Sequence, residues 1–400
     1  MDIAESFHIN PSTIKCIDMH TTGEPTRIIY SGFPHLDGET LLDKREQAQQ
    51  YHDNIRRRVM LEPRGHGHMY GAIVIPETEL VRSGDAHIGV LFTHAGGFST
   101  MCGHATIALG RFLVDTADLN VFPKRNELVV SQERAEVEVK IHAPCGVVRA
   151  IIPIVTDSAG KFKSDNSRGV SFLSSPGYAV TGLEVDIPEE IRWTELGNRK
   201  SIKVDISYGG AFYALVDARD LGFAEGLSGN KQRMAALAAA AKKLKGYLAN
   251  HPTVLEALQL VEDERLSFLY SVMVVDSKVG HRPDGVHGAE TGLCFFGDAD
   301  QVDRSPTGSC VTARVALAHA MGTREPDQKW AYNSLVSNQF KTGVFVGTVA
   351  EEDVSVTGHS GDSWPAIIVR VEGNAYYTGA VEFVQEAGDV TGEAGFTIDL

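Results

Sequence analysis

The sequence predicts a protein of the α/β class, of the α+β type, built from two similar domains. Three observations lead to this prediction. At 400 residues the chain is longer than one hydrophobic core usually organises. Short β-type runs separated by glycine-containing turns fill most of it. A similar stretch of sequence also occurs twice, once in each half of the chain.

The strand-forming segments are short and follow one another closely in both halves. In the first half they are "IKCIDMH", "TRIIYSG", "AIVIPE", "HIGVLFTHAGG", "ELVVS", "VEVKIH" and "VVRAIIPIV". In the second half they are "IKVDISYGGAFYALVDA", "FLYSVMVVD", "LCFFGDADQVDRS", "TGVFVGTVAEE" and "AIIVRVEG".

Five helices are expected among these strands. One of them is alanine-rich, has lysines towards its end and is followed by a proline, which is a good start and stop pattern. The expected helices span residues 39–58, 103–115, 231–249, 252–260 and 308–321.

A segment rich in Ser, Gly and Pro, "SDNSRGVSFLSSPGYAVTGLEVDIPEE", precedes the expected crossover between the domains near residues 185–200. We expect a first domain of residues 1–195, completed by residues 377–400, and a second domain of residues 196–376.

The composition is that of an ordinary globular protein, with 43% hydrophobic and 22% charged residues. A formal net charge of -15 argues against nucleic acid and anionic membranes as partners, because both are themselves negatively charged. The five cysteines contain no C-x-x-C pair, which argues against a disulfide framework and a zinc ribbon and favours a reducing compartment. We expect a cytoplasmic protein, since no signal peptide or membrane-spanning segment is recognisable.

The repeated stretches are "STMCGHATIALGRF" and "RSPTGSCVTARVALAHA". Each places a small reactive side chain before a glycine, a short polar stretch and an apolar helix. Cys102 and Thr307 occupy the matching positions, 205 residues apart by subtraction (307 minus 102). This duplication predicts that each domain presents the start of one helix to the functional site.

Helix starts suit the binding of an anion, because their first N–H groups are unpaired and the helix dipole is positive there. The N–H groups of Gly103, His104, Gly308 and Ser309 are therefore expected to bind a carboxylate. Such donors also stabilise the charge that develops when the neighbouring α-carbon loses a proton. A thiol at a helix start is favoured as a thiolate, which makes Cys102 the candidate base.

The two motifs resemble the signature motifs of the proline racemase family, whose members share a fold of the diaminopimelate-epimerase-like type. The likeness covers most of the chain through "HTTGEPTRII", "EPRGHGHMYGAIV", "DAHIGVLF" and "SYGGAFYALV". The resemblance implies two domains, each a mostly antiparallel curved sheet around a central helix, with the active site in the cleft between them. It also implies a small cyclic amino acid as the substrate and a homodimer as the assembly.

Members of the family that racemise or epimerise carry a cysteine in both motifs, one for each face of the α-carbon. Here Thr307 stands in place of the second cysteine, which resembles the branch that dehydrates trans-3-hydroxy-L-proline. A threonine hydroxyl is too weak an acid or base to exchange a proton at neutral pH. Cys102 alone would take the α-proton and then protonate the departing hydroxide on the same face. The expected product is an enamine that tautomerises to Δ1-pyrroline-2-carboxylate without a cofactor.

Further binding residues follow from the resemblance. His104 and Asp303 match positions that hydrogen-bond the ring nitrogen, while Tyr70 and Phe296 match aromatic walls of the pocket. The match of Phe296 requires a one-residue insertion in "FGDADQVD". Thr307 itself stays open between a hydrogen bond to the substrate, a space-filling role and capping of its helix.

Cys310 follows Thr307 closely and stays open between packing and a second catalytic thiol. No metal site is expected, because His66 and His68 have no Cys, Asp or Glu at ligand spacing. No cofactor is expected either, since the dinucleotide fingerprint and the phosphate-binding loop are both missing from the sequence.

Two other functions remain open. A proline or hydroxyproline racemase or 2-epimerase would require Thr307 or Cys310 to serve the second face. A non-catalytic binding protein for cyclic amino acids would keep the fold without the chemistry, but the intact Cys102, His104 and Asp303 argue against it.

Overall fold

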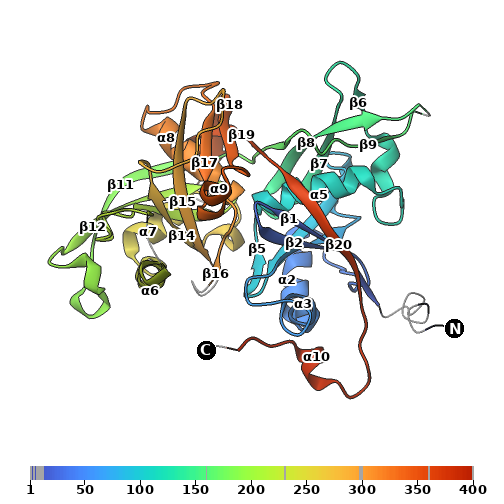
Figure 1. The fold of residues 1–400 in the computed structure, drawn as a ribbon, viewed down its shortest axis with the longest axis horizontal. Coiled ribbons are helices and arrows are strands. Elements are labelled where there is room, and N and C mark those ends of the chain that lie inside the picture. Colours follow the sequence, from blue (N-terminus) through green and yellow to red (C-terminus); the bar gives the residue numbers. More distant parts are fainter. Residues whose placement is uncertain are drawn as a thin grey trace. The chain divides into compact units, whose positions relative to one another are not determined.

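The structure is a computed structural model that describes residues 2, 5, 13–158, 160–228, 231–296, 301–358 and 361–398. The chain divides into two compact units (Figure 1). The first consists of Met1–Phe172 together with Asn374–Leu400, and the second of Leu173–Gly373.

The change of unit thus occurs before the expected crossover at residues 185–200. The reason is that β11 (Tyr178–Asp186) pairs with β12 (Ser201–Tyr208), which belongs to the second unit.

The first unit contains a mixed sheet in which most neighbouring strands are antiparallel. Its main strands neighbour one another in the order β20, β1, β2, β3, β4, β7, β8, and only the pairs β2–β3 and β4–β7 are parallel. Their bounds are β1 (Ile14–Thr21), β2 (Glu24–Ser31), β3 (Tyr70–Ile75), β4 (Ile88–His94), β7 (Glu136–Ala143), β8 (Gly146–Thr156) and β20 (Ala375–Phe383). The shorter strands are β5 (Gly97–Ser99), β6 (Val130–Ser131), β9 (Phe162–Ser164) and β10 (Val170–Leu173).

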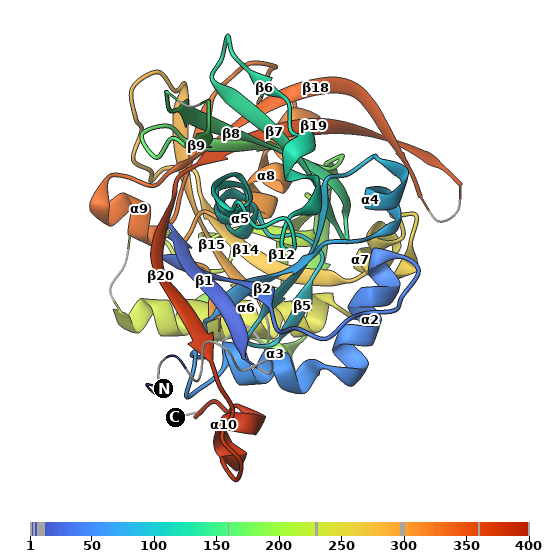
Figure 2. The ribbon, with the colours of Figure 1, turned by 90° about the vertical axis from the view of Figure 1, so that its right-hand side faces the viewer.

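Helix α5 (Gly103–Asp115) is the centre of this unit. It contacts β1, β2 and β20 as well as β8 and β9, so the sheet curves around it (Figure 2). Every residue from Gly103 to Val114 is buried, which fits a helix that is mostly apolar on all sides.

The connection from β2 to β3 carries two helices, α2 (Leu41–Tyr51) and α3 (Asp53–Met60). Thr40 and Asp43 form a capping box at the start of α2. One continuous helix over 39–58 was expected, but the backbone of His52 leaves the helical region at φ -129° and ends α2. The other helical segments of the unit are α4 (Glu79–Ser83), η1 (Pro123–Glu127) and α10 (Val390–Ala394).

The second unit has the same design. Its strands neighbour one another in the order β11, β12, β13, β14, β15, β17, β18, β19, and only β13–β14 and β15–β17 are parallel. Their bounds are β13 (Phe212–Asp217), β14 (Leu269–Asp276), β15 (Gly288–Phe296), β17 (Trp330–Asn333), β18 (Phe345–Thr357) and β19 (Ser363–Gly373), and β16 (Gln301–Val302) pairs with the end of β15. Helix α8 (Gly308–Ala320) contacts β11, β12, β13, β18 and β19.

The remaining helices of the second unit connect its strands. Two of them, α6 (Lys231–Leu248) and α7 (Pro252–Leu258), lie between β13 and β14 in the chain, where the first unit has α2 and α3. The others are α9 (Leu335–Phe340), η2 (Glu189–Ile191), η3 (Thr194–Leu196) and η4 (Glu264–Leu266).

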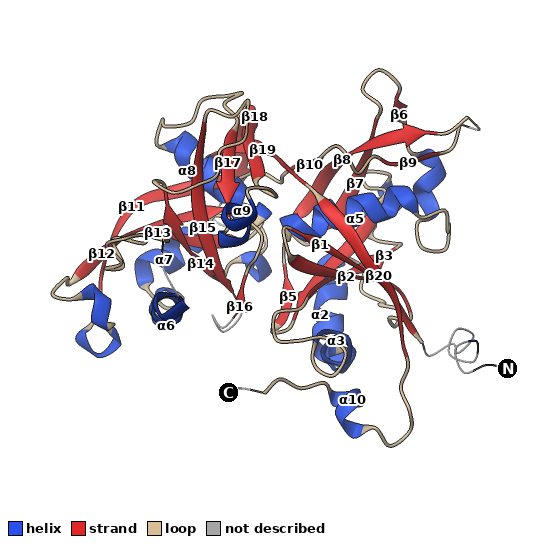
Figure 3. Ribbon diagram, in the orientation of Figure 1, coloured by secondary structure: helices blue, strands red, loops and turns tan. Residues whose placement is uncertain are grey.

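The two units therefore repeat one topology. In each, the strand pairs from the first to the seventh strand run antiparallel, antiparallel, parallel, antiparallel, parallel and antiparallel. Helices α5 and α8 both contain 13 residues. Figure 3 shows strands as the major element of both units. The predicted fold class, with two similar and mostly antiparallel sheets each around a helix, is confirmed.

Across the described ranges, the structure contains no helix with both the length and the apolar character needed to cross a membrane.

Candidate active site

Cys102 lies at the start of α5, as the sequence predicts. It is the N-cap residue, with an extended backbone at φ -146° and ψ 111°. Its Sγ accepts a hydrogen bond from the N–H of Ala105 at 3.4 Å, and its carbonyl oxygen accepts one from Thr106 Oγ1 at 2.7 Å. The side chain is 4% exposed. The sulfur is therefore held against the positive end of the helix, where a thiolate is favoured.

His104 is a titratable neighbour of this sulfur. Its Nδ1 lies 3.2 Å from Cys102 Sγ, and its carbonyl oxygen accepts a hydrogen bond from Thr21 Oγ1 at 3.0 Å. The ring of Tyr70 meets the imidazole edge-on, with 4.8 Å between ring centroids, and the Tyr70 hydroxyl hydrogen-bonds Ser99 Oγ. The first unit thus brings Cys102, Gly103, His104 and Tyr70 together. An imidazole in this position can hold the proton that the thiol gives up.

The start of α8 in the second unit is built differently. Its N-cap residue, Thr307, has a left-handed backbone at φ 63° and ψ 89°, and its side chain does not cap the helix. A β-branched residue in this region costs about 1–3 kcal/mol. The Thr307 hydroxyl instead donates to Asp303 Oδ2 at 2.8 Å. Capping of α8 by the Thr307 side chain, one of the roles left open, is therefore wrong.

The carboxylate of Asp303 accepts hydrogen bonds from the loop before α8. Its Oδ1 accepts a hydrogen bond from the N–H of Ser305 at 2.7 Å, and Ser305 Oγ accepts one from the N–H of Thr307 at 3.1 Å. Asp303 is 4% exposed and Thr307 is 7% exposed. The second unit thus brings Asp303, Thr307, Gly308 and Ser309 together on one short, internally bonded segment.

The hydroxyl of Ser309 faces the interior of the second unit. Its Oγ hydrogen-bonds the hydroxyl of Tyr213 at 2.6 Å, and burial raises the pKa of Tyr213 well above its ordinary value. The predicted role of Ser309 concerns its backbone instead. Gly103, Gly308 and Ser309 lie in the first turn of their helices, where the helical bonding pattern leaves the N–H groups for another acceptor.

Strand β15 adds a residue that the sequence analysis missed. Cys294 is 1% exposed, and its Sγ lies 3.0 Å from Ser271 Oγ. Burial, together with the charge of Asp303, raises the pKa of Cys294 to about 12. Strand alternation was the available signal, because Cys294 lies on the same face as Phe296, which the sequence analysis had selected.

Phe296 itself stacks on Tyr270, with ring centroids 6.3 Å apart. The loop with Asp303 lies beside this strand, since the N–H of Asp303 donates to the carbonyl of Cys294 at 3.2 Å. Cys310, in contrast, is fully buried within α8, and burial raises the pKa of its thiol well above the ordinary value. A thiol that stays protonated there favours the packing role of Cys310 over a catalytic one.

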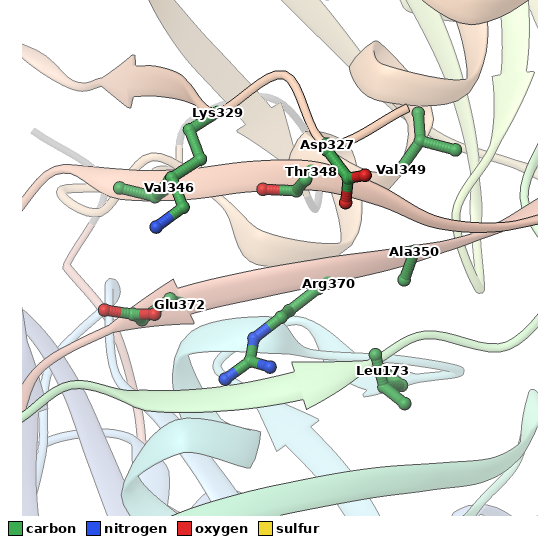
Figure 4. A pocket seen from close by; sticks show the side chains of 9 residues that line it. All are labelled: Leu173, Asp327, Lys329, Val346, Thr348, Val349, Ala350, Arg370 and Glu372. Carbon is green, nitrogen blue, oxygen red and sulfur yellow. The ribbon is translucent and has the colours of Figure 1, made fainter. Parts of the chain in front are cut away.

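A cavity of about 510 Å³ lies elsewhere in the second unit. Figure 4 shows its lining residues, among them Thr348 from β18 and Arg370 and Glu372 from β19. None of the predicted site residues lines it. This cavity therefore does not bear on the predicted roles of the residues at the helix starts.

Among the residues that the structure describes, no three His, Cys, Asp or Glu side chains are placed to hold a metal ion. His66 and His68 lie with their ring centroids 6.4 Å apart, and His66 Nδ1 accepts a hydrogen bond from the N–H of His68 at 3.2 Å.

Known proteins resemble this chain over almost its whole length. It is 39% identical over 379 residues to the trans-3-hydroxy-L-proline dehydratase of Homo sapiens, covering 94% of this chain and 92% of that protein. Its fold is similar to a probable proline racemase from Agrobacterium radiobacter K84 with bound carbonate, at a TM-score of 0.72, 22% identity and 96% coverage of both chains. It is also similar to a hydroxyproline epimerase from Agrobacterium vitis with bound trans-4-hydroxy-L-proline, at a TM-score of 0.70, 21% identity and 96% and 95% coverage.

A family model described as proline racemase matches residues 16–396. This match includes both helix starts, with Cys102 before α5 and Thr307 before α8. The chain therefore belongs to the proline racemase family.

Proposed function

We propose that this protein is a hydro-lyase that dehydrates trans-3-hydroxy-L-proline to Δ1-pyrroline-2-carboxylate without a cofactor. The observation that carries the proposal is the unequal pair of helix starts. Cys102 supplies a thiol beside His104, whereas the matching Thr307 supplies a hydroxyl already bound to Asp303. The human relative with 39% identity is named for the same reaction.

In this proposal the residues at both helix starts bind one substrate. The N–H groups of the helix starts receive the carboxylate, since helix N-termini are natural anion sites. His104 and Asp303 receive the ring ammonium, which is a hydrogen-bond donor and a cation. Tyr70 and Phe296 contact the apolar faces of the ring.

Cys102 then acts twice on the same face of the ring. Its thiolate takes the α-proton, and the resulting charge is delocalised into the carboxylate, where the helix N–H groups stabilise it. The bond from C3 to the hydroxyl oxygen breaks, and the Cys102 thiol returns the proton to the departing hydroxide. One water is released and a C2–C3 double bond forms. In the trans isomer the α-hydrogen and the hydroxyl share one face, so a single thiol suffices.

The direct test follows imine formation from trans-3-hydroxy-L-proline in the parent and in Cys102→Ala. Removal of the base is expected to lower kcat by at least about 10²–10⁴-fold. Cys310→Ala is the matched control, a second thiol-to-methyl change, here within α8, and it is expected to keep the parent's rate. Undiminished imine formation by Cys102→Ala would contradict the single-thiol mechanism.

Racemisation or 2-epimerisation is the other enzymatic interpretation, and it needs an acid on the second face of the α-carbon. The hydroxyl proton of Thr307 is donated to Asp303, and the thiol of Cys310 is fully buried. Neither observation favours a proton donor on the second face of the α-carbon. Rapid interconversion of L- and D-proline, followed by optical rotation, would reverse this choice.

We also propose that the protein works in the cytoplasm as a homodimer. None of the five cysteines, all of which lie in the described ranges, forms a disulfide, which suits a reducing compartment. The family resemblance suggests the dimer, and light scattering of the purified protein measures it.

A further inference from the structure

Four charged side chains and one hydroxyl line the cavity of about 510 Å³ in the second unit. The charges belong to Asp327, Lys329, Arg370 and Glu372, and the hydroxyl belongs to Thr348. Figure 4 shows Arg370 and Glu372 on one side of the cavity and the other three residues across from them. The volume is in the range of small-molecule sites, and the proposed function uses none of these residues.

Strand pairing places the side chains from β18 and β19 on one face of the sheet. Thr348 of β18 pairs with Arg370 of β19. Two residues along, Val346 pairs with Glu372. Residues two apart on a strand share a face, so these four side chains lie on the same side. Helix α8 packs on the opposite side, because a Cβ built on Gly347 would lie 2.8 Å from a valine of that helix.

Lys329 extends this arrangement to a third strand. It directly precedes β17, where Trp330 pairs with Gly347 of β18. Continuing that antiparallel register by one residue places Lys329 beside Thr348. Lys329 and Arg370 thus flank the Thr348 hydroxyl on strands that are about 4.8 Å apart. Two cations and a hydroxyl in one row can together hold a carboxylate.

The charged side chains at the cavity do not neutralise one another. In the described part of the chain, none of the four makes a hydrogen bond or an ion pair through its side chain. Arg370 is half-buried, so its guanidinium has lost part of its hydration without gaining a partner in the protein. Arg370 and Glu372 are about 7 Å apart along β19, which leaves room for a ligand that carries both charges.

We propose that this cavity binds a neutral amino acid with an apolar side chain, in its zwitterionic form. The carboxylate of the ligand is held by Arg370 and Lys329, with the Thr348 hydroxyl as a further donor. Its ammonium is held by the carboxylate of Glu372, with Asp327 as the second anion of the cavity.

The balance of charges selects a zwitterion over a singly charged ligand. An inorganic anion in the cavity would meet two carboxylates, and a simple amine would meet two cations. The rest of the lining accounts for the apolar side chain of the ligand. It consists of Leu173, Val346, Val349 and Ala350.

Three probes that share one apolar group test the need for both charges in the parent protein. L-leucine carries both charges, isocaproate lacks the ammonium, and isopentylamine lacks the carboxylate. In calorimetric titrations we expect L-leucine to bind about tenfold more tightly than either of the others, since each loses one set of charge-assisted hydrogen bonds. Absence of L-leucine binding, or equal binding of isocaproate or isopentylamine, would overturn the proposal.

Two single variants locate the bound probe. Arg370→Gln and Glu372→Gln each remove one charge and are each expected to weaken L-leucine about tenfold. Arg149→Gln, which changes a strand arginine of the first unit, is the matched control and should bind L-leucine as the parent does. An affinity that is unchanged in both cavity variants would place the probe elsewhere and refute the proposed site.

The result is independent of the proposed dehydration, because the cavity contains none of the residues at the helix starts. Imine formation from trans-3-hydroxy-L-proline is measured on the same proteins. A parent that forms no imine but binds L-leucine with this pattern refutes the dehydration and supports the amino acid site. A parent that forms imine but binds no L-leucine does the reverse.

Discussion

At the scale of single residues, Thr307 separates this chain from a symmetric two-thiol site. Thr307→Cys places a thiol at the start of α8, where Cys102 stands at the start of α5. A thiol can exchange a proton with the second face, which a hydroxyl cannot do at neutral pH. We expect this variant to invert L-proline about 10²-fold faster or more than the parent, measured by optical rotation. Thr307→Ser is the matched control, and equal inversion rates for both variants would show that position 307 does not face the α-carbon.

A second residue-scale prediction concerns the buried hydroxyl pair of Tyr213 and Ser309, whose oxygens are 2.6 Å apart. Tyr213→Phe leaves Ser309 Oγ without this partner and is expected to lower the free energy of unfolding by about 1–3 kcal/mol. Adding Ser309→Ala removes the second polar atom as well, so the double variant should lose less than the sum of the two single losses. Urea unfolding of all four proteins measures the coupling, and strictly additive losses would refute it.

The sequence was informative about those candidate site residues that lie in local motifs. The pattern of glycine and apolar residues predicts two helix starts, and four of the candidate residues lie at or close to them: Cys102, His104, Asp303 and Thr307. The partners of these residues were not predictable in the same way. Tyr213 and Ser271 come from other strands, and only the pairing of distant segments brings them to Ser309 and Cys294.

At the scale of elements, the position of α8 depends on a close approach by the turn between β12 and β13. A Cβ built on Gly209 would lie 2.1 Å from the carbonyl oxygen of Ser309 and 2.7 Å from the N–H nitrogen of Ala313. Both atoms belong to the helix backbone and cannot move as a side-chain tip can. Gly209→Ala is therefore expected to displace the start of α8, lowering the free energy of unfolding by about 2 kcal/mol or more and reducing kcat/KM.

Gly246→Ala is the control for this prediction. Gly246 lies in α6, where an added Cβ meets no atom within 4 Å, and alanine favours a helix. We expect this variant to be at least as stable as the parent and equally active. If Gly209→Ala behaved in the same way, α8 would not depend on this contact.

The elements themselves were largely predictable, with errors at the ends. The helix expected over 103–115 has the same bounds as α5, and those expected over 231–249 and 308–321 end one residue later than α6 and α8. The break at His52 was not predictable, because both α2 and α3 are made of good helix formers. A change of direction between two such helices depends on their packing against the sheet.

At the scale of the whole molecule, the burial of ionisable thiols makes the free energy of unfolding depend on pH in the alkaline range. Burial raises the pKa of Cys16 in the first unit and of Cys294 in the second from 9.0 to about 12. The folded forms therefore keep these protons between about pH 9 and 12, whereas the unfolded chain loses them. The stabilisation is complete below the unfolded pKa and is lost as pH rises through this window, by about 1.4 kcal/mol per pH unit for each thiol.

The free energy of unfolding, measured in urea at several values above about pH 9, should fall less steeply in Cys16→Ala/Cys294→Ala than in the parent. The comparison uses slopes, so that a uniform loss of stability in the variant does not affect it. Identical slopes would mean that these two thiols titrate alike in the folded and unfolded chains.

The duplication was visible in the sequence only at the helix starts, where two motifs lie 205 residues apart. The matching strand orders of the two units were not visible in the sequence, because the repeated strands differ in sequence and length. Which unit a strand joins is decided by pairing, and β11 illustrates this by joining β12 across the expected boundary.

The pairing of β1 with β20 has a consequence for how the protein is made. Residues 375–383 emerge from the ribosome only after the whole second unit has been synthesised. Until then the growing polypeptide carries an unprotected edge at Ile14–Thr21, of the kind that invites pairing with other chains. The first unit is thus translated first but completed last, because its sheet gains β20 only after the second unit has been made.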